Sequence, residues 1–342
     1  MKLFETNISS YYAHGDIARV IESGNLGFGP NVTKFESMFA PYSSKKHNVA
    51  VNSASAAAFT TFAYLKETYG ACDVFTTSIG FTSVTWAAKH HGHNLIFVDV
   101  DSSMLMDMKK YEYERRIRCE RYSDGGIKPV IMPVLYGGVS TISGFEETVE
   151  SGGYNEFIVV DSAHCVTPKI KSDVTFFSFH PYKPIAASDG GMLSTDNGEI
   201  DEYARSYRNF GRNNNADGYQ ISSEGFKFYM NNLNATIALT QLEVYNENLL
   251  IRKESYKNLI ALNLNGNLAE HDEHSSYYIG TLIADSEQQA IEYRNKYCQD
   301  RLYPPLHSQP YYDSVEFTEM GKTEEQYKLL VNLPLYKPEV YE

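Results

Sequence analysis

The chain contains Phe157-Ile158-Val159-Val160-Asp161, an unbroken apolar run that ends in a carboxylate. A strand without polar alternation is typical of a sheet that helices cover on both faces. The next apolar run, Val174 to Phe179, leads to Lys183 and then to a diglycine turn at Gly190-Gly191. Because ligands of open α/β sheets bind at the carboxyl ends of strands, Asp161 and Lys183 are candidates for one binding site. The ordinary alternatives are a helix cap for Asp161 and a solvated charge for Lys183.

The rest of the first two-thirds of the chain alternates apolar runs with helical patterns. Further strands are predicted at Val49 to Asn52, Leu95 to Val100, Val130 to Val134 and Met192 to Thr195. Helices are predicted at Ala56 to Tyr69, Val84 to His91, Phe145 to Glu150 and Glu199 to Tyr207. This alternation is typical of an α/β fold with helices on both faces of one sheet.

The last third of the chain has a different pattern. A helical pattern runs from Leu233 towards Leu262 with no proline to end it. The sequence then indicates a strand at Tyr277 to Ile283 and a helix at Glu287 to Tyr297. We therefore expect a large α/β domain over residues 1–245 and a small α+β domain over residues 246–342.

Composition limits the classes of protein. With 42% hydrophobic and 21% charged residues, the 342-residue chain has ordinary globular usage. Its net charge of -13 would repel a phosphate backbone, so nucleic acid is not an expected partner. The four cysteines form no CxxC pair, so neither a disulfide framework nor a zinc site is expected. With neither a signal-like N-terminus nor a run of about 20 apolar residues, the sequence predicts a cytoplasmic protein without a membrane span.

A third candidate element is Asn52-Ser53-Ala54-Ser55-Ala56, which closes one predicted strand and opens a helix. Small residues leave the first-turn amides of the helix open, and helix N-termini attract phosphate groups. A plain serine N-cap on an alanine-rich helix explains the same residues. The segment is not a Walker P-loop, and Gly27-Phe28-Gly29-Pro30 lacks the preceding strand and third glycine of a dinucleotide fingerprint.

Two other groups are set aside as sites. Adjacent histidines diverge on a helix, and His90, His91 and His93 have no acidic partner at helical spacing, so no metal site is predicted. His164 and Cys165 are neighbours in the sequence, whereas a cysteine nucleophile needs its histidine on a facing element.

Taken in order, the candidate segments resemble the motifs of the DegT/DnrJ/EryC1/StrS family of sugar aminotransferases. The resembling segments are Gly24 to Pro30, Asn52 to Ala57, Val160 to His164, Ser178 to Pro184, Gly190 to Met192, Tyr303 to His307 and Leu333 to Leu335. The resemblance implies the fold-type-I architecture of enzymes that use pyridoxal 5'-phosphate (PLP). In that architecture a large, mostly parallel mixed sheet is flanked by helices, and a smaller C-terminal α+β domain follows.

The resemblance also implies a role for each residue of a cofactor site. Lys183 would bind the cofactor aldehyde and then carry protons as general base and acid. Asp161 would keep the pyridine nitrogen protonated, and His164 would reach the phenolic oxygen. The remaining cofactor contacts would come from Ser55, the amides of Ser55 and Ala56, and Ser178 at the phosphate, and from Phe81 over the ring.

The chain departs from the family pattern at residues implied to bind the substrate or a second subunit. Lys227 stands where the family has an asparagine that reaches the phosphate of the neighbouring subunit, which implies a homodimer with a shared active site. Tyr229 replaces an arginine, and Leu135 replaces a common histidine. The implied substrate-binding residues are Phe28, Tyr229 and His307.

The implied reaction moves an amino group, from glutamate, to the keto carbon of a nucleotide-linked deoxy sugar, with C4 favoured. Two rival functions differ in chemistry. A PLP-dependent sugar dehydratase of the same fold carries histidine in place of the lysine, so Lys183 disfavours it. A cofactor-binding regulator or scaffold without catalysis is the second rival, and the departures at Lys227 and Tyr229 favour it.

Overall fold

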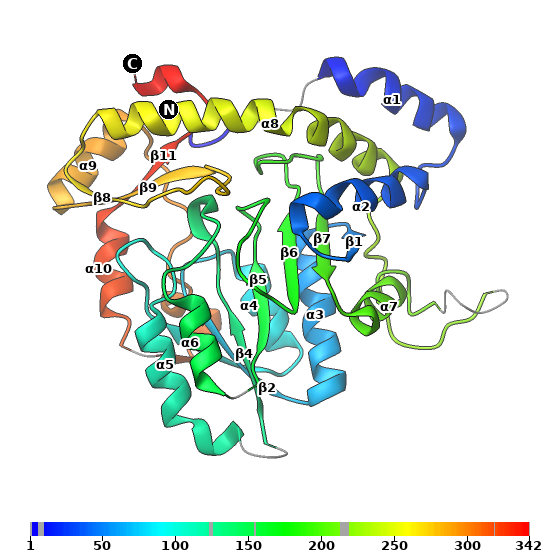
Figure 1. Ribbon diagram of the computed structural model, residues 1–342, viewed down its shortest axis with the longest axis horizontal. Coiled ribbons are helices and arrows are strands. Elements are labelled where there is room, and N and C mark those ends of the chain that lie inside the picture. The colour runs from blue at the N-terminus through cyan, green and yellow to red at the C-terminus, as the bar shows by residue number, and fades with distance from the viewer. Residues whose placement is uncertain are drawn as a thin grey trace.

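The computed structural model describes residues 2–5, 10–122, 126–153, 155–212, 219–317 and 319–341. An eight-stranded sheet forms its centre, in the order β1-β7-β6-β5-β4-β2-β3-β10 (Figure 1). Its strands are β1 (His47–Val51), β2 (Cys72–Thr77), β3 (Asn94–Val98), β4 (Lys128–Met132), β5 (Phe157–Asp161), β6 (Val174–Ser178), β7 (Gly191–Thr195) and β10 (Glu316–Phe317). Strand β7 runs antiparallel to both of its neighbours, β1 and β6, and the other pairs in this sheet are parallel. The predicted α/β fold with a mostly parallel mixed sheet is confirmed.

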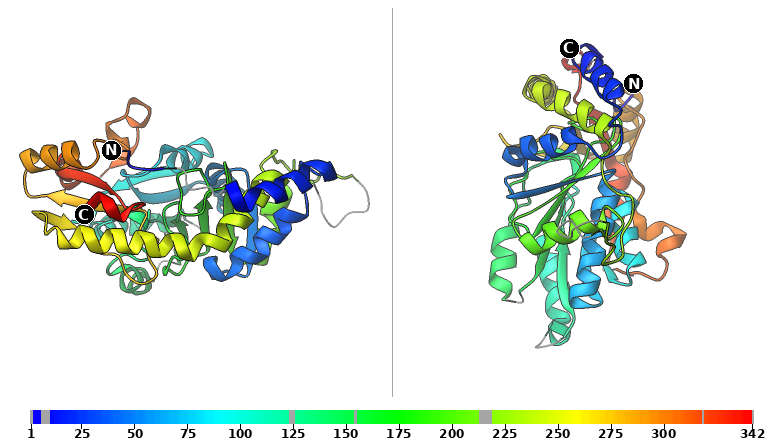
Figure 2. Two further views of the ribbon diagram at one scale, coloured as in Figure 1. Left: turned by 90° about the horizontal axis from the view of Figure 1, so that it is seen from above. Right: turned by 90° about the vertical axis from the view of Figure 1, so that its right-hand side faces the viewer.

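Helices cover both faces of this sheet, which explains the unbroken apolar strands (Figure 2). On one face lie α3 (Ala54–Tyr69), α4 (Thr82–His90) and α7 (Gly198–Tyr207). On the other lie α5 (Met108–Ile117), α6 (Phe145–Gly152), α2 (Pro30–Ser43) and α8 (Asn232–Ala261). Val159 belongs to the core of the first face and Val160 to that of the second. Burying each such side chain stabilises the fold by roughly 1.5–3 kcal/mol.

The sequence pattern does not predict β2, although this strand lies between β3 and β4 in the sheet. All six of its residues are buried, but Asp73 interrupts their apolar run. The Asp73 carboxylate accepts hydrogen bonds from Asn94 at 2.9 Å and from Arg121 at 3.1 Å. A buried carboxylate is tolerable when it is paired, and these partners lie too far along the chain for a local pattern to reveal.

A small sheet follows α8, in the order β11-β9-β8. It consists of β8 (Gly266–Leu268), β9 (Ile279–Ala284) and β11 (Leu330–Pro334), and it packs with α9 (Glu287–Lys296) and α10 (Gly321–Leu329). The 30-residue helix α8 runs straight through the predicted boundary at residue 245, and β10 of the C-terminal part pairs with β3 of the large sheet. The division into domains 1–245 and 246–342 therefore stays a prediction.

The two ends of the described chain lie beside the small sheet (Figure 1). Tyr336 Oη donates to the Lys2 carbonyl at 2.9 Å, and Lys337 pairs with Glu5 at 2.8 Å. Helix α1 (Ser10–Ser23) packs against α8. Short 3-10 helices occur at Cys119–Tyr122, Tyr136–Gly138, Leu306–Ser308, Pro310–Tyr312 and Pro338–Tyr341. Among the described helices, none has both the length and the apolar character needed to cross a membrane.

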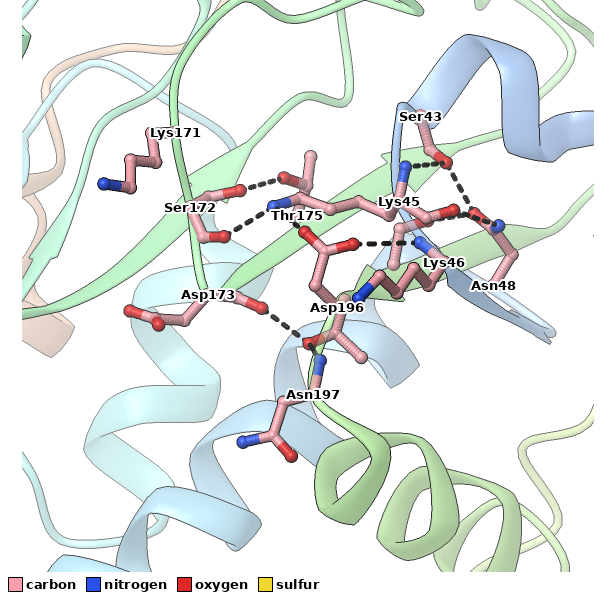
Figure 3. Close-up of polar contacts among 12 residues, drawn as sticks. Ser43, Lys45, Lys46, Asn48, Lys171, Ser172, Asp173, Thr175, Asp196 and Asn197 are labelled. Atoms are coloured by element: carbon pink, nitrogen blue, oxygen red, sulfur yellow. Dashed lines mark hydrogen bonds and ion pairs between the residues drawn. The ribbon is translucent and has the colours of Figure 1, made fainter.

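A polar network links the chain segments at the end of the sheet where β1 begins and β7 ends (Figure 3). Lys45 Nζ donates to the Ser172 carbonyl at 2.6 Å and pairs with Asp196 at 3.0 Å. Asn48 Oδ1 accepts a hydrogen bond from Ser43 Oγ at 2.8 Å. These contacts tie the α2–β1 connection to β6 and β7, and they leave the opposite edge of the same strands for a binding site.

Candidate active site

The candidate residues meet at the edge of the sheet where β2, β4, β5 and β6 end and β7 begins. Asp161 is the last residue of β5, and Gly191 of β7 pairs with both Val51 and Ser178. A cavity of about 500 Å³ opens at this edge. Six residues proposed from the sequence line it, namely Ser55, Phe81, Asp161, His164, Ser178 and Lys183.

Lys183 and Asp161 line the same cavity and influence each other's charge. Asp161 is 4% exposed, and burial raises its pKa to about 6, against the opposing effects of the Ala163 N–H and Lys183. Burial lowers the pKa of the half-buried Lys183 to about 7, and the charge of Asp161 opposes this shift. Both groups therefore change protonation near neutral pH, which is the property needed of residues that transfer protons.

His164 is buried beside this pair as a neutral imidazole. Burial, with a contribution from the Lys183 charge, holds the pKa of His164 well below its ordinary value. The Gly137 N–H donates to His164 Nδ1 at 3.3 Å. Because Nδ1 accepts, the ring proton is on Nε2, which is then available to donate a hydrogen bond to an acceptor such as an oxygen.

The N-terminus of α3 supplies backbone donors to the cavity. Ser53 is the N-cap, and its Oγ accepts from the Ala56 N–H at 3.1 Å, as N-cap serines do. The amides of Ala54 and Ser55 have no acceptor within the part of the chain that the structure describes. Ser53, Ala54 and Ser55 all line the cavity. The amides open to a phosphate are therefore those of Ala54 and Ser55, whereas the predicted Ala56 amide is already engaged by the cap.

Gly191 lets the strand β7 pass directly behind this helix start. A Cβ atom at Gly191 would lie 2.4 Å from the Ser53 carbonyl carbon and 2.5 Å from the Ala54 nitrogen. Contacts this short with backbone atoms leave room for glycine alone. Gly191, the second glycine of the predicted turn, thus allows β7 to lie close to the amides at the start of α3.

Besides Ala56, four proposed residues do not line this cavity, namely Phe28, Lys227, Tyr229 and His307. Lys227 is exposed, with its Nζ 5.8 Å from the centroid of the Tyr229 ring. Phe28 packs edge-on against Tyr229. His307 Nδ1 is hydrogen-bonded to Ser78 Oγ at 2.7 Å, which fastens the segment after residue 303 to the end of β2. Their substrate-binding and inter-subunit roles stay predictions.

Aromatic residues that the sequence argument did not single out as site residues form one wall of the cavity. Phe4 stacks on Tyr278 at 4.7 Å, Tyr278 lies 4.5 Å from His164, and the Tyr303 ring lies 5.6 Å from Phe81, all between ring centroids. Together with His164 and Phe81, these three residues come from five separate segments of the chain. Tyr303 belongs to a resembling motif, but nothing local in the sequence distinguishes Phe4 or Tyr278 from the other aromatic residues.

Comparison with known sequences covers nearly the whole chain. The model of the DegT/DnrJ/EryC1/StrS aminotransferase family matches residues 12–339. The spore coat polysaccharide biosynthesis protein SpsC of Bacillus subtilis (strain 168) is 31% identical over 247 residues. That match covers 67% of this chain and 60% of SpsC, so it spans less than two thirds of the relative's length.

Two solved structures share the architecture. A DegT DnrJ EryC1 StrS aminotransferase from Brucella abortus has a TM-score of 0.85 at 20% identity, covering 98% of this chain and 94% of its own. The Spr1654 protein of Streptococcus pneumoniae, in its PMP form, has a TM-score of 0.84 at 20% identity, covering 98% of this chain and 92% of its own. At this identity the likeness shows the fold, and the fold predicted from the sequence is confirmed.

Proposed function

Because the chain belongs to the DegT/DnrJ/EryC1/StrS aminotransferase family, we propose that it is a PLP-dependent sugar aminotransferase. Its amino donor is glutamate, and its acceptor is the keto carbon, at C4, of a nucleotide-linked deoxy sugar. One observation carries the proposal: a buried carboxylate and a half-buried amine, Asp161 and Lys183, line one cavity beside the open amides of α3.

The donor groups of the cavity fit PLP. The amides of Ala54 and Ser55, with the hydroxyls of Ser55 and Ser178, suit a phosphate at a helix N-terminus. The carboxylate of Asp161 suits a protonated ring nitrogen, and the Nε2 proton of His164 suits the phenolic oxygen. The cavity therefore offers a complementary group for each polar part of the cofactor.

When bound, PLP supplies an aldehyde that takes up an amine and a ring that accepts electrons. The protein supplies the proton chemistry. With a pKa of about 7, Lys183 can both take a proton from a substrate carbon and return it at physiological pH. A charged Asp161 would hold a proton on the ring nitrogen of bound PLP, and the burial of this carboxylate would exclude water and strengthen the ion pair.

We further propose a homodimer in which Lys227 serves the site of the partner subunit. The supporting observation is that the Lys227 side chain is exposed and does not line the cavity of its own chain. In a dimer with two-fold symmetry, Lys227 of each subunit would reach the active site of the other. Mixing Lys183→Ala with Lys227→Ala protein tests this, because a hybrid has one site with both residues intact. About a quarter of wild-type activity should return from a random mixture; no recovery from verified hybrids would contradict the arrangement.

The substrate is tested by incubating the full chain with PLP, glutamate and a panel of keto-sugar nucleotides and measuring product masses. The proposal predicts that glutamate removes the visible absorption band of the bound cofactor and that a keto sugar restores it with a gain of one amino group. Lys183→Ala is the control that should show neither change. A band that glutamate leaves unaltered would favour the silent regulator or scaffold, and loss of a sugar hydroxyl without amination would favour a dehydratase.

A further inference from the structure

Tyr278 brings an aromatic ring from the C-terminal part of the chain to Lys183. The Lys183 Nζ lies 4.7 Å from the centroid of the Tyr278 ring, within the range of a cation–π contact. Tyr278 is 3% exposed, lines the cavity and lies immediately before β9. The face of an aromatic ring carries partial negative charge, so it attracts an ammonium group without requiring the phenol hydroxyl.

Contacts from several segments fix the plane of this ring. Phe4 stacks on it with an interplanar angle of 15°. The Tyr278 N–H donates to the Gly137 carbonyl at 3.1 Å, and a Cβ at Gly138 would lie 2.9 Å from the Tyr278 Cβ. The backbone and the ring are thus both held, so the amine meets a fixed surface rather than a mobile side chain.

We propose that Tyr278 is a positioning residue of the reaction: the face of its ring holds the ammonium group of Lys183 near Asp161 whenever the lysine is not joined to the cofactor. The inference rests on the proposed function, which requires Lys183 to be released and recaptured in each cycle. A lysine kept at one place can re-form its bond without a conformational search.

Other charged groups also act on Lys183. Asp161 favours the charged amine, as Tyr278 does, whereas burial and any charge on His164 or His180 disfavour it. The other titratable and charged residues that line the cavity are Tyr182, Asp189, Asp300, Arg301 and Tyr303. A test must therefore change the partial negative charge on the face of the Tyr278 ring and leave these groups and the packing unchanged.

Fluorination of the ring meets this requirement, because each fluorine weakens the negative face with little change in volume. The series is Tyr278→Phe followed by its mono-, tri- and pentafluorinated analogues in the full chain without cofactor. The readout is the pH dependence of chemical labelling of the Lys183 amine, located by mass spectrometry. We expect the pKa of Lys183 to be nearly unchanged in Tyr278→Phe and to fall stepwise with fluorination, by about one unit in total.

The matched control is the same series at Tyr277, the neighbouring buried tyrosine, which stacks on His271 and is not among the residues that line the cavity. A pKa of Lys183 that stays constant across the fluorinated series at Tyr278 would overturn the inference. An equal fall of this pKa across the series at Tyr277 would overturn it as well. Labelling needs neither cofactor nor turnover, so a failure of the contact is seen separately from a failure of the proposed reaction. The reaction is measured separately, as the loss of the absorption band when glutamate is added to PLP-loaded Tyr278→Phe protein. If the variant still loses the band, the ring rather than the hydroxyl carries the role.

Discussion

Replacing Lys183 with methionine should stabilise the cofactor-free chain, although it removes the residue that the proposed reaction needs. Burial lowers the pKa of Lys183 from its ordinary 10.5 to about 7. One pKa unit corresponds to about 1.4 kcal/mol, so keeping this amine charged costs the folded state at most roughly 5 kcal/mol. Methionine removes that cost but leaves the Asp161 carboxylate without its partner. We therefore expect a net gain of about 2 kcal/mol in the free energy of unfolding at pH 6.

The pH dependence of this gain follows from proton binding. Between pH 7 and 10.5 the folded chain binds fewer protons at Lys183 than the unfolded chain, so wild-type stability should rise with pH across this interval. The variant lacks this rise, and its advantage should shrink from pH 7 upward. Asp161, with a pKa of about 6 against an ordinary 3.8, makes wild-type stability fall between pH 3.8 and 6. The variant lacks the Lys183 charge that opposes the rise in this pKa, so the decrease should extend to higher pH in the variant and reduce its advantage further.

Urea unfolding at pH 6, 7, 8 and 9, at one protein concentration, measures the effect. The fluorescence of Trp86, the chain's one tryptophan, and circular dichroism report on unfolding. Lys171→Met is the control, because that lysine is exposed and its replacement should change stability little. A Lys183→Met protein that is less stable than wild type at pH 6, or an advantage that does not decrease with pH, would refute the reasoning.

Three further predictions concern the surroundings of the same amine. Gly191→Ala should weaken PLP binding at least about tenfold and cost a few kcal/mol of stability, since its Cβ would meet the Ser53 backbone at 2.4 Å; PLP titration and urea unfolding measure both, and unchanged affinity would show that β7 can move away. Asp161→Asn should retain cofactor but lower turnover about a hundredfold or more in steady-state assays, and wild-type turnover would remove the carboxylate from the mechanism. Ser53→Ala should cost about 1 kcal/mol in thermal unfolding through loss of the helix cap, and a much larger loss would show that the serine has another role.

The sequence predicts the chemistry of the strand ends better than it predicts the walls of the cavity. Asp161 and Lys183 follow consecutive apolar strands, so the topology of a parallel sheet is enough to bring them together. Phe4 and Tyr278 reach the same cavity through contacts between the first residues of the chain and the turn before β9. No local periodicity records such contacts, since they depend on how distant segments pack.

Finer details of the proposed phosphate site also depended on the structure. The sequence indicates a helix start with small residues at Asn52 to Ala56, and α3 begins there. The structure shows which amides remain open, because the Ala56 N–H donates to both Oγ and the carbonyl oxygen of Ser53, which leaves the amides of Ala54 and Ser55. A capping serine and a phosphate-binding helix start are thus compatible, and the two interpretations of this segment do not exclude each other.

The central claim is that the Lys183 amine, which shares its cavity with Asp161, is the group that binds PLP. Borohydride makes a bond between a lysine and PLP permanent, so peptide mass spectrometry of the reduced, PLP-loaded chain tests the claim directly. We predict a pyridoxyl label on Lys183, lost in Lys183→Met and retained in Lys171→Met. A label on another lysine, or none after PLP has been shown to bind, would contradict the account.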